Sequence, residues 1–252
     1  MKKIKNYIQF IKENSMFQYN NMIDYTLLEE SATDSDIIEL CKKADMLGVK
    51  SVCVLPKHVA LAKEQLKESK VLVCTVVSFP SGTNTTISKL NETQQVINDG
   101  ADEVDMVFNY PLLQKHYEDG KEELLYDVNT LVEECHKHKN KEGNPIILKV
   151  IVESGLLSEK DTKLATEICM DAGADFIKTS TGKVSVGAEM NKIQIMYDNI
   201  QASGSNMKIK ASGGVRTAEQ IKSMIGMVDR FGMGYAAVDK LNGLESDKPI
   251  GY

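Results

Sequence analysis

The sequence is poor in several features that mark common classes of protein. It contains no tryptophan. No apolar run reaches about 18 residues, which excludes an ordinary membrane-spanning helix. It also lacks a block of basic residues and carries a formal net charge of −6, so we expect no binding to nucleic acid. No apolar signal segment follows the basic start at Lys2 and Lys3, so we expect no secretion signal.

Cysteine and histidine are scarce, with five and four residues, and no two cysteines are spaced as C-x-x-C. An odd number of widely spaced cysteines predicts reduced thiols and a cytoplasmic protein. His136 and His138 stand two positions apart in a predicted helix, so they face different directions. We therefore predict neither a metal site nor a cofactor, and we expect the chemistry to depend on lysine and carboxylate side chains.

What the sequence does contain is an alternation of short β-branched runs with longer amphipathic segments. Eight short apolar runs predict buried parallel strands, at residues 22–27, 51–55, 71–78, 103–108, 146–153, 176–179, 207–211 and 230–232. Eight strand–helix units in 252 residues favour a (β/α)8 barrel over a doubly wound sheet. No G-x-G-x-x-G motif follows the first strand, which argues against dinucleotide binding.

Capping signals place helices between these strands. Thr33 with Asp36 predicts a helix start, and Gly100 and Gly173 predict helix ends that lead into strands. Helices are expected at 87–98 and 160–171, and residues 121–139 form the longest predicted helical segment. We expect residues 1–252 to form one domain, with an extra helix over residues 1–20 and a flexible tail over residues 242–252.

Charged residues inside the predicted strands are the most informative feature. Lys149, Lys178 and Lys210 each lie in an otherwise apolar strand, and Glu103 and Asp105 lie in another. A single strand lysine is more often a structural ion pair or a charge that reaches solvent. Three lysines and acids on the converging strands of one barrel instead predict a cluster in its interior, because isolated buried charges are costly.

Such a cluster suits Schiff-base chemistry. A buried lysine close to a second ammonium group loses its proton more readily, and a neutral amine attacks carbonyl carbons. A nearby carboxylate can relay protons through water while the imine forms and is hydrolysed.

Two glycine-containing turns predict a phosphate site. Gly182 and Lys183 follow the sixth strand, and Gly213 and Gly214 follow the seventh before a helix that opens near Thr217. Backbone N–H groups of a Gly-Gly turn can surround an anion, and barrels commonly bind phosphate in their last loops.

Several of these segments, taken in order, resemble the deoxyribose-phosphate aldolase family. They read GADEVD at 100–105, KVIVE at 149–153, GADFIKTSTGK at 173–183 and KASGGVRT at 210–217. The resemblance extends from about Asp24 to Gly232, and the stretch 173–183 is its most specific part.

The resemblance implies a class I, metal-free aldolase on a (β/α)8 barrel. Such enzymes cleave 2-deoxy-D-ribose 5-phosphate to acetaldehyde and D-glyceraldehyde 3-phosphate. By motif, Lys178 matches the lysine that forms the Schiff base. Lys210 matches the lysine that lowers the pKa of the Schiff-base lysine, and Asp105 matches the aspartate that relays protons. The implied substrate- and phosphate-binding residues are Asp24, Cys53, Gly182, Lys183, Gly213, Gly214, Gly232 and Gly234. We also expect a homo-oligomer, either a dimer or a tetramer.

The sequence departs from the family pattern after the eighth strand. Gly234 and Tyr235 stand where the family typically has two serines that help to hold phosphate, although the backbone N–H of Gly234 remains. Tyr252 ends the chain and is a candidate proton donor, because some family members use a C-terminal tyrosine in this way. Two alternatives stay open: another phosphate-binding barrel enzyme, such as an isomerase or a transaldolase-like enzyme, or a non-catalytic relative.

Overall fold

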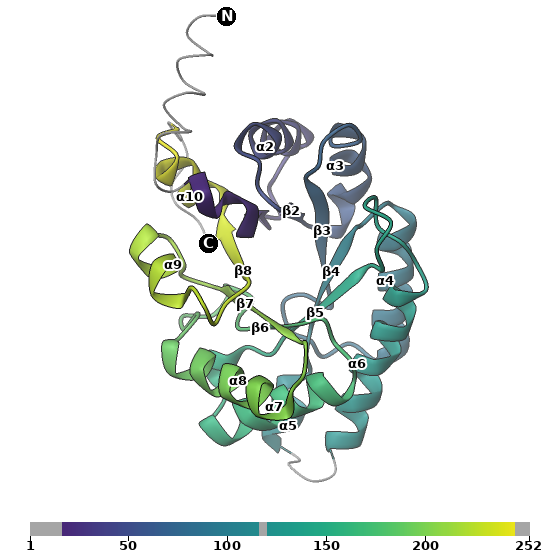
Figure 1. The fold of residues 1–252 in the computed structure, drawn as a ribbon. Helices are drawn as coiled ribbons and strands as arrows, with labels where there is room; N and C mark the ends of the chain where they lie inside the picture. Colours follow the sequence, from purple (N-terminus) through teal and green to yellow (C-terminus); the bar gives the residue numbers. More distant parts are fainter. Residues whose placement is uncertain (1–16, 116–119, 245–252) are drawn as a thin grey trace, which may run out of the picture.

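The computed structural model describes residues 17–115 and 120–244, and within them a closed parallel barrel. The eight strands pair in sequence order, and the last closes on the first. They are β1 (Ile23–Leu27), β2 (Ser51–Val54), β3 (Leu72–Val77), β4 (Glu103–Val107), β5 (Ile147–Ile151), β6 (Phe176–Lys178), β7 (Lys208–Ser212) and β8 (Arg230–Gly234). Helices surround the strands (Figure 1). The predicted (β/α)8 barrel is confirmed.

The α-helices lie in the connections between strands and after β8. They are α2 (Asp34–Leu47), α3 (Val59–Gln65), α4 (Thr86–Asn98), α5 (Tyr110–Lys115), α6 (Gly120–His136), α7 (Glu159–Asp171), α8 (Met190–Ser203), α9 (Ala218–Met224) and α10 (Tyr235–Leu241). Short 3-10 helices are η1 (Phe17–Met22), η2 (Pro56–His58) and η3 (Ser154–Leu156). Among the described residues, no helix is long and apolar enough to cross a membrane.

The strands separate two kinds of side chain because successive residues point to opposite faces. In β4, Val104 and Met106 belong to the main apolar core, between the barrel and its helices. Glu103 and Asp105 alternate with them and therefore point into the barrel. All four side chains are fully buried.

The helix ends follow the local sequence signals. Thr33 and Asp36 form a reciprocal capping box at the start of α2. Gly100 and Gly173, which come just after α4 and α7, have φ of 104° and 78° and so adopt backbone conformations that suit glycine. The longest of the described helices, α6, ends at His136, three residues before the predicted end.

Boundaries differ from the prediction at the two ends of the chain. Of the predicted N-terminal helix, residues 1–16 lie outside the described part, and its remainder falls in the 3-10 helix η1. Strand β8 continues to Gly234, two residues beyond the predicted end. Of the predicted tail, Asn242 is buried, and its side-chain amide donates to the carbonyl of Val238 at 2.9 Å. Residues 245–252 lie outside the described part.

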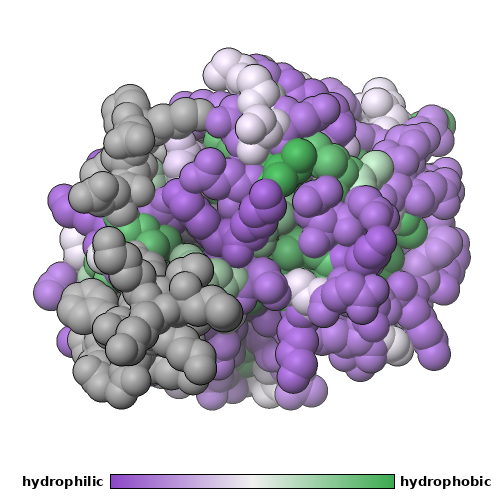
Figure 2. Space-filling view, turned by 90° about the horizontal axis from the view of Figure 1, so that it is seen from above, coloured by the Kyte–Doolittle hydropathy of each residue, from purple (hydrophilic) through white to green (hydrophobic). Residues whose placement is uncertain are grey.

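The surface of this fold is mostly polar. In the view from above, hydrophilic side chains cover most of the visible face, and hydrophobic residues lie in recesses between them (Figure 2). This pattern agrees with helices that turn an apolar face toward the barrel and a polar face outward.

Candidate active site

The carboxylate of Asp105 lies at the centre of the predicted charge cluster. Its Oδ2 atom accepts hydrogen bonds from Lys178 at 2.8 Å and from Lys210 at 2.7 Å. Its Oδ1 atom accepts from Lys149 at 2.8 Å. Each of these lysine side chains is at most 1% exposed. Three lysine side chains from β5, β6 and β7 therefore converge on one carboxylate from β4.

A second set of charges lies beside this carboxylate, toward the amino-terminal ends of the strands. Asp24 on β1 contacts Lys210 through Oδ2 and accepts from Arg230 at 2.7 Å through Oδ1. Glu103 contacts Lys149 at 2.8 Å and Arg230 at 3.2 Å. The four cations and three carboxylates thus form one connected network inside the barrel.

The network fixes the protonation of most of its members. Burial alone would raise the pKa of Asp105, but Lys149, Lys178 and Lys210 outweigh it and hold that pKa well below its usual value. Arg230 and the lysines lower the pKa of Asp24 in the same way against burial. Burial would lower the pKa of Lys210, but Asp105 and Asp24 raise it, so this lysine stays an ammonium group.

Two buried thiols complete the wall of the site. Cys53 and Cys74 are register partners on β2 and β3. The Sγ atom of Cys74 lies 3.2 Å from Oδ1 of Asp105 and 3.3 Å from Nζ of Lys149. A hydrogen bond from Cys74 lowers the pKa of the Cys53 thiol, whereas burial raises the pKa of Cys74. Cys53 therefore lies beside Cys74, close to the charge network.

The side chains of this site include a possible set of metal ligands. Cys53, Cys74 and Asp105 could bring one ligand atom each close together, and so could Asp24, Cys74 and Glu103. However, ammonium and guanidinium groups already contact both oxygens of Asp105 and of Asp24. Positively charged side chains thus occupy the places at these carboxylates that a cation would take.

The predicted glycine loops lie close together at the carboxyl-terminal end of the barrel. Gly182, Gly213 and Gly214 have φ values of 78°, 78° and 79°, which side chains rarely tolerate. A Cβ atom added to Gly187 would lie 2.0 Å from the carbonyl oxygen of Gly213, so the loops after β6 and β7 touch. The hydroxyl of Ser180, in the same place, is buried and has no hydrogen-bond partner among the described residues.

Comparison with known proteins places this geometry in a family. The model of the DeoC/LacD family of aldolases matches residues 19–237. The chain belongs to this family. It is 44% identical over 207 residues to a deoxyribose-phosphate aldolase of Mycoplasmoides pirum, covering 82% of this chain and 89% of the relative.

Two further relatives agree. The deoxyribose-phosphate aldolase of Staphylococcus carnosus is 40% identical over 231 residues, which cover 91% of this chain and 98% of the relative. The solved structure of the tetrameric deoxyribose phosphate aldolase from Aeropyrum pernix superposes with a TM-score of 0.78 at 28% identity. That match covers 95% of this chain and 97% of the other.

Because Gly234 and Tyr235 stand at the end of β8, this aldolase has no serine hydroxyl at these two positions. Gly234 is buried and has no side chain to offer. Tyr235 opens α10, and its ring packs edge-on against Tyr25, with centroids 6.4 Å apart. Tyr25 follows the inward Asp24, so it faces the helical layer, where its hydroxyl donates to Asp239. The Tyr235 ring therefore lies outside the barrel.

Three more of the predicted site residues are Lys183, Gly232 and Tyr252. Lys183 reaches across the barrel mouth, and its Nζ donates to the carbonyl of Leu28 at 3.3 Å. A Cβ atom on Gly232 would lie 3.1 Å from Cε of Lys210, so this glycine makes room for that lysine. Tyr252 lies outside the described residues.

Sequence reasoning missed several members of the network. Arg230 and Cys74 were not predicted as site residues, and Lys149 and Glu103 were noted only as charges within strands. Arg230 is the first residue of a strand, so the same signal, a charge in an apolar run, was present. The predicted strand 230–232 already began at Arg230, but its charge was not singled out.

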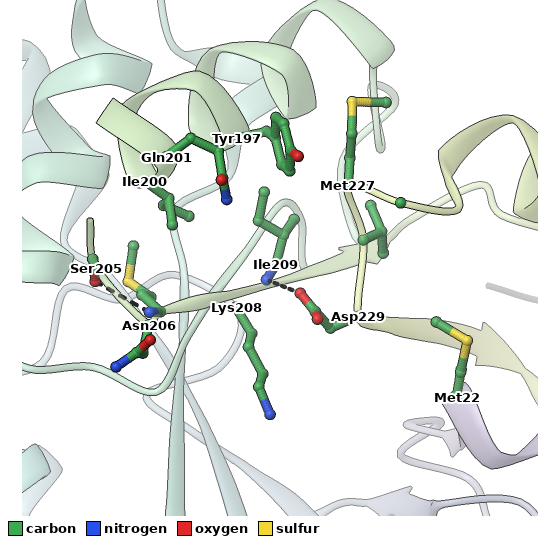
Figure 3. A pocket seen from close by; sticks show the side chains of 13 residues that line it. Met22, Tyr197, Ile200, Gln201, Ser205, Asn206, Lys208, Ile209, Met227 and Asp229 are labelled. Atoms are coloured by element: carbon green, nitrogen blue, oxygen red, sulfur yellow. Dashed lines mark hydrogen bonds between the residues drawn. The ribbon is translucent and has the colours of Figure 1, made fainter. Parts of the chain in front are cut away.

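A cavity at the other end of the barrel is separate from this site. It has a volume of about 460 Å³ and lies between α8 and the segments before β7 and β8 (Figure 3). Asp229 lines it and accepts a hydrogen bond from the backbone of Ile209 at 3.1 Å. None of the residues that line it belongs to the charge network.

Proposed function

We propose that this chain catalyses the reversible cleavage of 2-deoxy-D-ribose 5-phosphate to acetaldehyde and D-glyceraldehyde 3-phosphate through a Schiff base on Lys178. One observation carries the assignment of the nucleophile. Lys149 makes ion contacts with three carboxylates and Lys210 with two, whereas the ion contact of Lys178 is with Asp105. The lysine with the fewest ion contacts is the best placed to react as a neutral amine.

The first half of the reaction builds the imine. The neutral amine of Lys178 attacks C1 of the open-chain aldehyde and forms a carbinolamine. Once Lys178 is neutral, Oδ2 of Asp105 has lost one of its two cationic contacts and can accept a proton through a water molecule. Loss of water from the carbinolamine then gives the iminium ion, with Lys210 remaining charged beside it.

The second half breaks the carbon–carbon bond. The C3 hydroxyl loses its proton, the C2–C3 electron pair moves into the iminium, and glyceraldehyde 3-phosphate leaves. The enamine that remains takes a proton at C2, and hydrolysis of the new imine releases acetaldehyde and free Lys178. We propose Tyr252 as a candidate donor for the C2 proton.

The phosphate group would bind in the loops after β6, β7 and β8. Gly182, Gly213 and Gly214 provide backbone N–H groups in left-handed conformations, which form concave anion sites. The buried and unpartnered hydroxyl of Ser180 supplies a further polar group beside them. Lys183 adds a positive charge at the mouth, and Gly234 offers its backbone N–H where relatives have serine.

The wider setting of the enzyme is also part of the proposal. The five cysteines are buried and unpaired, as in a protein of a reducing compartment, and we place the enzyme in the cytoplasm. We propose a homo-oligomer, a dimer or tetramer, and the tetrameric relative from Aeropyrum pernix supports this. Its partners are phosphorylated sugars and aldehydes.

Borohydride trapping tests the mechanism directly. The protein is incubated with 2-deoxyribose 5-phosphate and reduced, and the modified lysine is located by peptide mass spectrometry. We expect a stable adduct on Lys178 and none on Lys149 or Lys210. An adduct on either of the other lysines would contradict the assignment of the nucleophile.

Two controls complete the experiment. A Lys178→Arg variant keeps the charge but removes the nucleophilic amine, so it should give no adduct. Unphosphorylated 2-deoxyribose should require a higher concentration for the same yield, because it lacks the group that the glycine loops bind. A folded wild-type protein that gives no adduct at saturating substrate would refute the Schiff base and favour an isomerase or a non-catalytic relative.

A further inference from the structure

We infer that Arg230 is a positioning residue that sets, through Asp24 and Glu103, the pH at which Lys178 becomes a free amine. The inference builds on the proposed function, because it concerns the state of the same nucleophile. Arg230 lies at the first position of β8 and is 6% exposed, and its ion pairs are with Asp24 and Glu103.

The guanidinium group of Arg230 holds two carboxylates at once. Nη1 lies 2.7 Å from Oδ1 of Asp24, and Nη1 and Nη2 lie 3.2 to 3.3 Å from the carboxylate of Glu103. The ring of Phe176 covers the group, with 5.6 Å between Cζ and the ring centroid. Arginine keeps its proton throughout the pH range of proteins, so this charge is permanent.

Each of these carboxylates in turn holds a lysine in contact with Asp105, and Lys149 also lies 3.8 Å from Asp24. Asp24 contacts Lys210, and Glu103 contacts Lys149 at 2.8 Å. Both lysines also donate to Asp105. Arg230 therefore fixes the two carboxylates that orient the neighbours of Lys178, and it acts on the nucleophile through them.

The charges of the network show what Arg230 contributes. The ion pairs join three carboxylates to four cations, and Arg230, Lys149 and Lys210 alone balance the carboxylates. The proton of Lys178 is therefore a surplus positive charge within this network, and its loss leaves the network neutral. Without Arg230, three carboxylates would face three lysines, and the proton of Lys178 would be needed for balance.

Other titratable groups face the same space. Cys53 on β2, Cys74 on β3 and Glu153 after β5 interact electrostatically with Lys178 or with its partner Asp105. Of these groups, Cys74 also interacts electrostatically with Arg230. They are common to all variants described below, so they do not change the sign of the expected shift.

The test measures the proton of Lys178 without requiring turnover. Reductive methylation by formaldehyde and cyanoborohydride needs only a free amine, and peptide mass spectrometry gives its extent at Lys178 as a function of pH. We expect Arg230→Gln to shift this profile upward by about one pH unit. Arg230→Lys, which keeps the charge, should stay close to the wild-type profile.

Charge-matched variants separate electrostatics from damage to the fold. Glu103→Gln removes a negative charge and should shift the profile downward. The double variant Arg230→Gln/Glu103→Gln removes one charge of each sign and should return it toward wild type. If Arg230→Gln does not fold, the inference is tested by two other profiles. Glu103→Gln should shift the methylation profile downward, and the double variant should bring it back toward the wild-type profile.

Several results would overturn the inference. An unchanged methylation profile in Glu103→Gln, or in folded Arg230→Gln, would show that the network does not set the proton of Lys178. So would a uniform loss of reactivity at every pH, which is the mark of a merely structural role. Since methylation needs no aldol cleavage, a failure of the proposed function would appear separately, as absent trapping with 2-deoxyribose 5-phosphate.

Discussion

Two buried lysines, one inside the barrel and one in its helical layer, have similar contacts but different surroundings. Lys178 donates to Asp105 at 2.8 Å, and Lys89 of α4 donates to Asp127 of α6 at 2.5 Å. Lys89 also donates to the carbonyl of Val107 at 3.1 Å, at the end of β4. Both side chains are buried, with 1% and 0% of their surface exposed.

The difference lies in how many cations share each carboxylate. Asp127 has one cationic partner among the described ion pairs, so the pair in the helical layer is balanced. Asp105 is shared by three lysines, and the ion pairs around it join four basic side chains to three carboxylates. Burial is common to both lysines, so in the proposed mechanism it is the ratio of charges around Lys178 that distinguishes it from Lys89.

The largest expected effect is the loss of activity on removing the barrel lysine. Lys178→Met should lower the rate of 2-deoxyribose 5-phosphate cleavage by at least ~10⁴-fold, because no other amine takes the place of the nucleophile. Lys89→Met is the matched control, since it removes a lysine that is equally buried. It should leave the cleavage rate per folded molecule within about threefold of wild type.

Equal losses of activity in the two variants would contradict this distinction. Residual activity in Lys178→Met that depends on Lys210 would also contradict it, because the second lysine would then be an alternative nucleophile. If Lys210 were such an alternative nucleophile, the double variant Lys178→Met/Lys210→Met would lose the residual activity of Lys178→Met.

The stability of the same two variants should change in the opposite order. Lys89→Met leaves Asp127 buried without a partner, and should lower the free energy of unfolding by about 3 to 5 kcal/mol. Lys178→Met removes a surplus charge, so the free energy of unfolding should change by only about 1 kcal/mol. Chemical denaturation of the two variants, measured side by side, gives both values.

A double variant shows whether the effect at Lys89 comes from the orphaned charge. Lys89→Met/Asp127→Leu replaces the whole pair by apolar groups, and it should recover most of the lost stability. If the double variant is as unstable as the single one, packing around the lysine rather than the uncompensated carboxylate explains the loss.

The same contrast explains how far the sequence could be interpreted. Charges within short β-branched runs are unusual, so Lys178, Lys210 and Asp105 could be selected before the fold was known. Lys89 lies in an amphipathic helix, where a lysine is ordinarily on the polar face, and nothing local indicates that it is buried. Its partner Asp127 lies 38 positions away, on another helix.

The geometry of the site depends on register, which the sequence does not display. Asp105 pairs with Lys149 and Lys178 with Lys210 only because neighbouring strands align at those positions. Likewise, the direction of the Tyr235 ring depends on the end of β8, which lies two residues later than expected, and on the start of α10 directly after it. The strands could be predicted from residue type, whereas the contacts between side chains of different strands are defined only by the register of the closed barrel.

The smallest expected effect concerns two glycines that share one backbone conformation, one at the barrel mouth and one in the scaffold. Gly213 has φ of 78° and lies in the predicted phosphate-binding site, and Gly204 has φ of 70° at the end of α8. Alanine at either position should lower the free energy of unfolding by about 1 kcal/mol, because a side chain disfavours this conformation.

Only the glycine at the mouth should affect substrate binding. A Cβ atom at Gly213 would lie 3.1 Å from both Cα of Gly187 and Cβ of Ser180, whereas one at Gly204 would meet nothing within 4 Å. Gly213→Ala should therefore raise KM for 2-deoxyribose 5-phosphate by about tenfold, and much less for unphosphorylated 2-deoxyribose. Steady-state kinetics on both sugars measures this, and an equal rise for the two sugars would mean that the loop does not hold the phosphate.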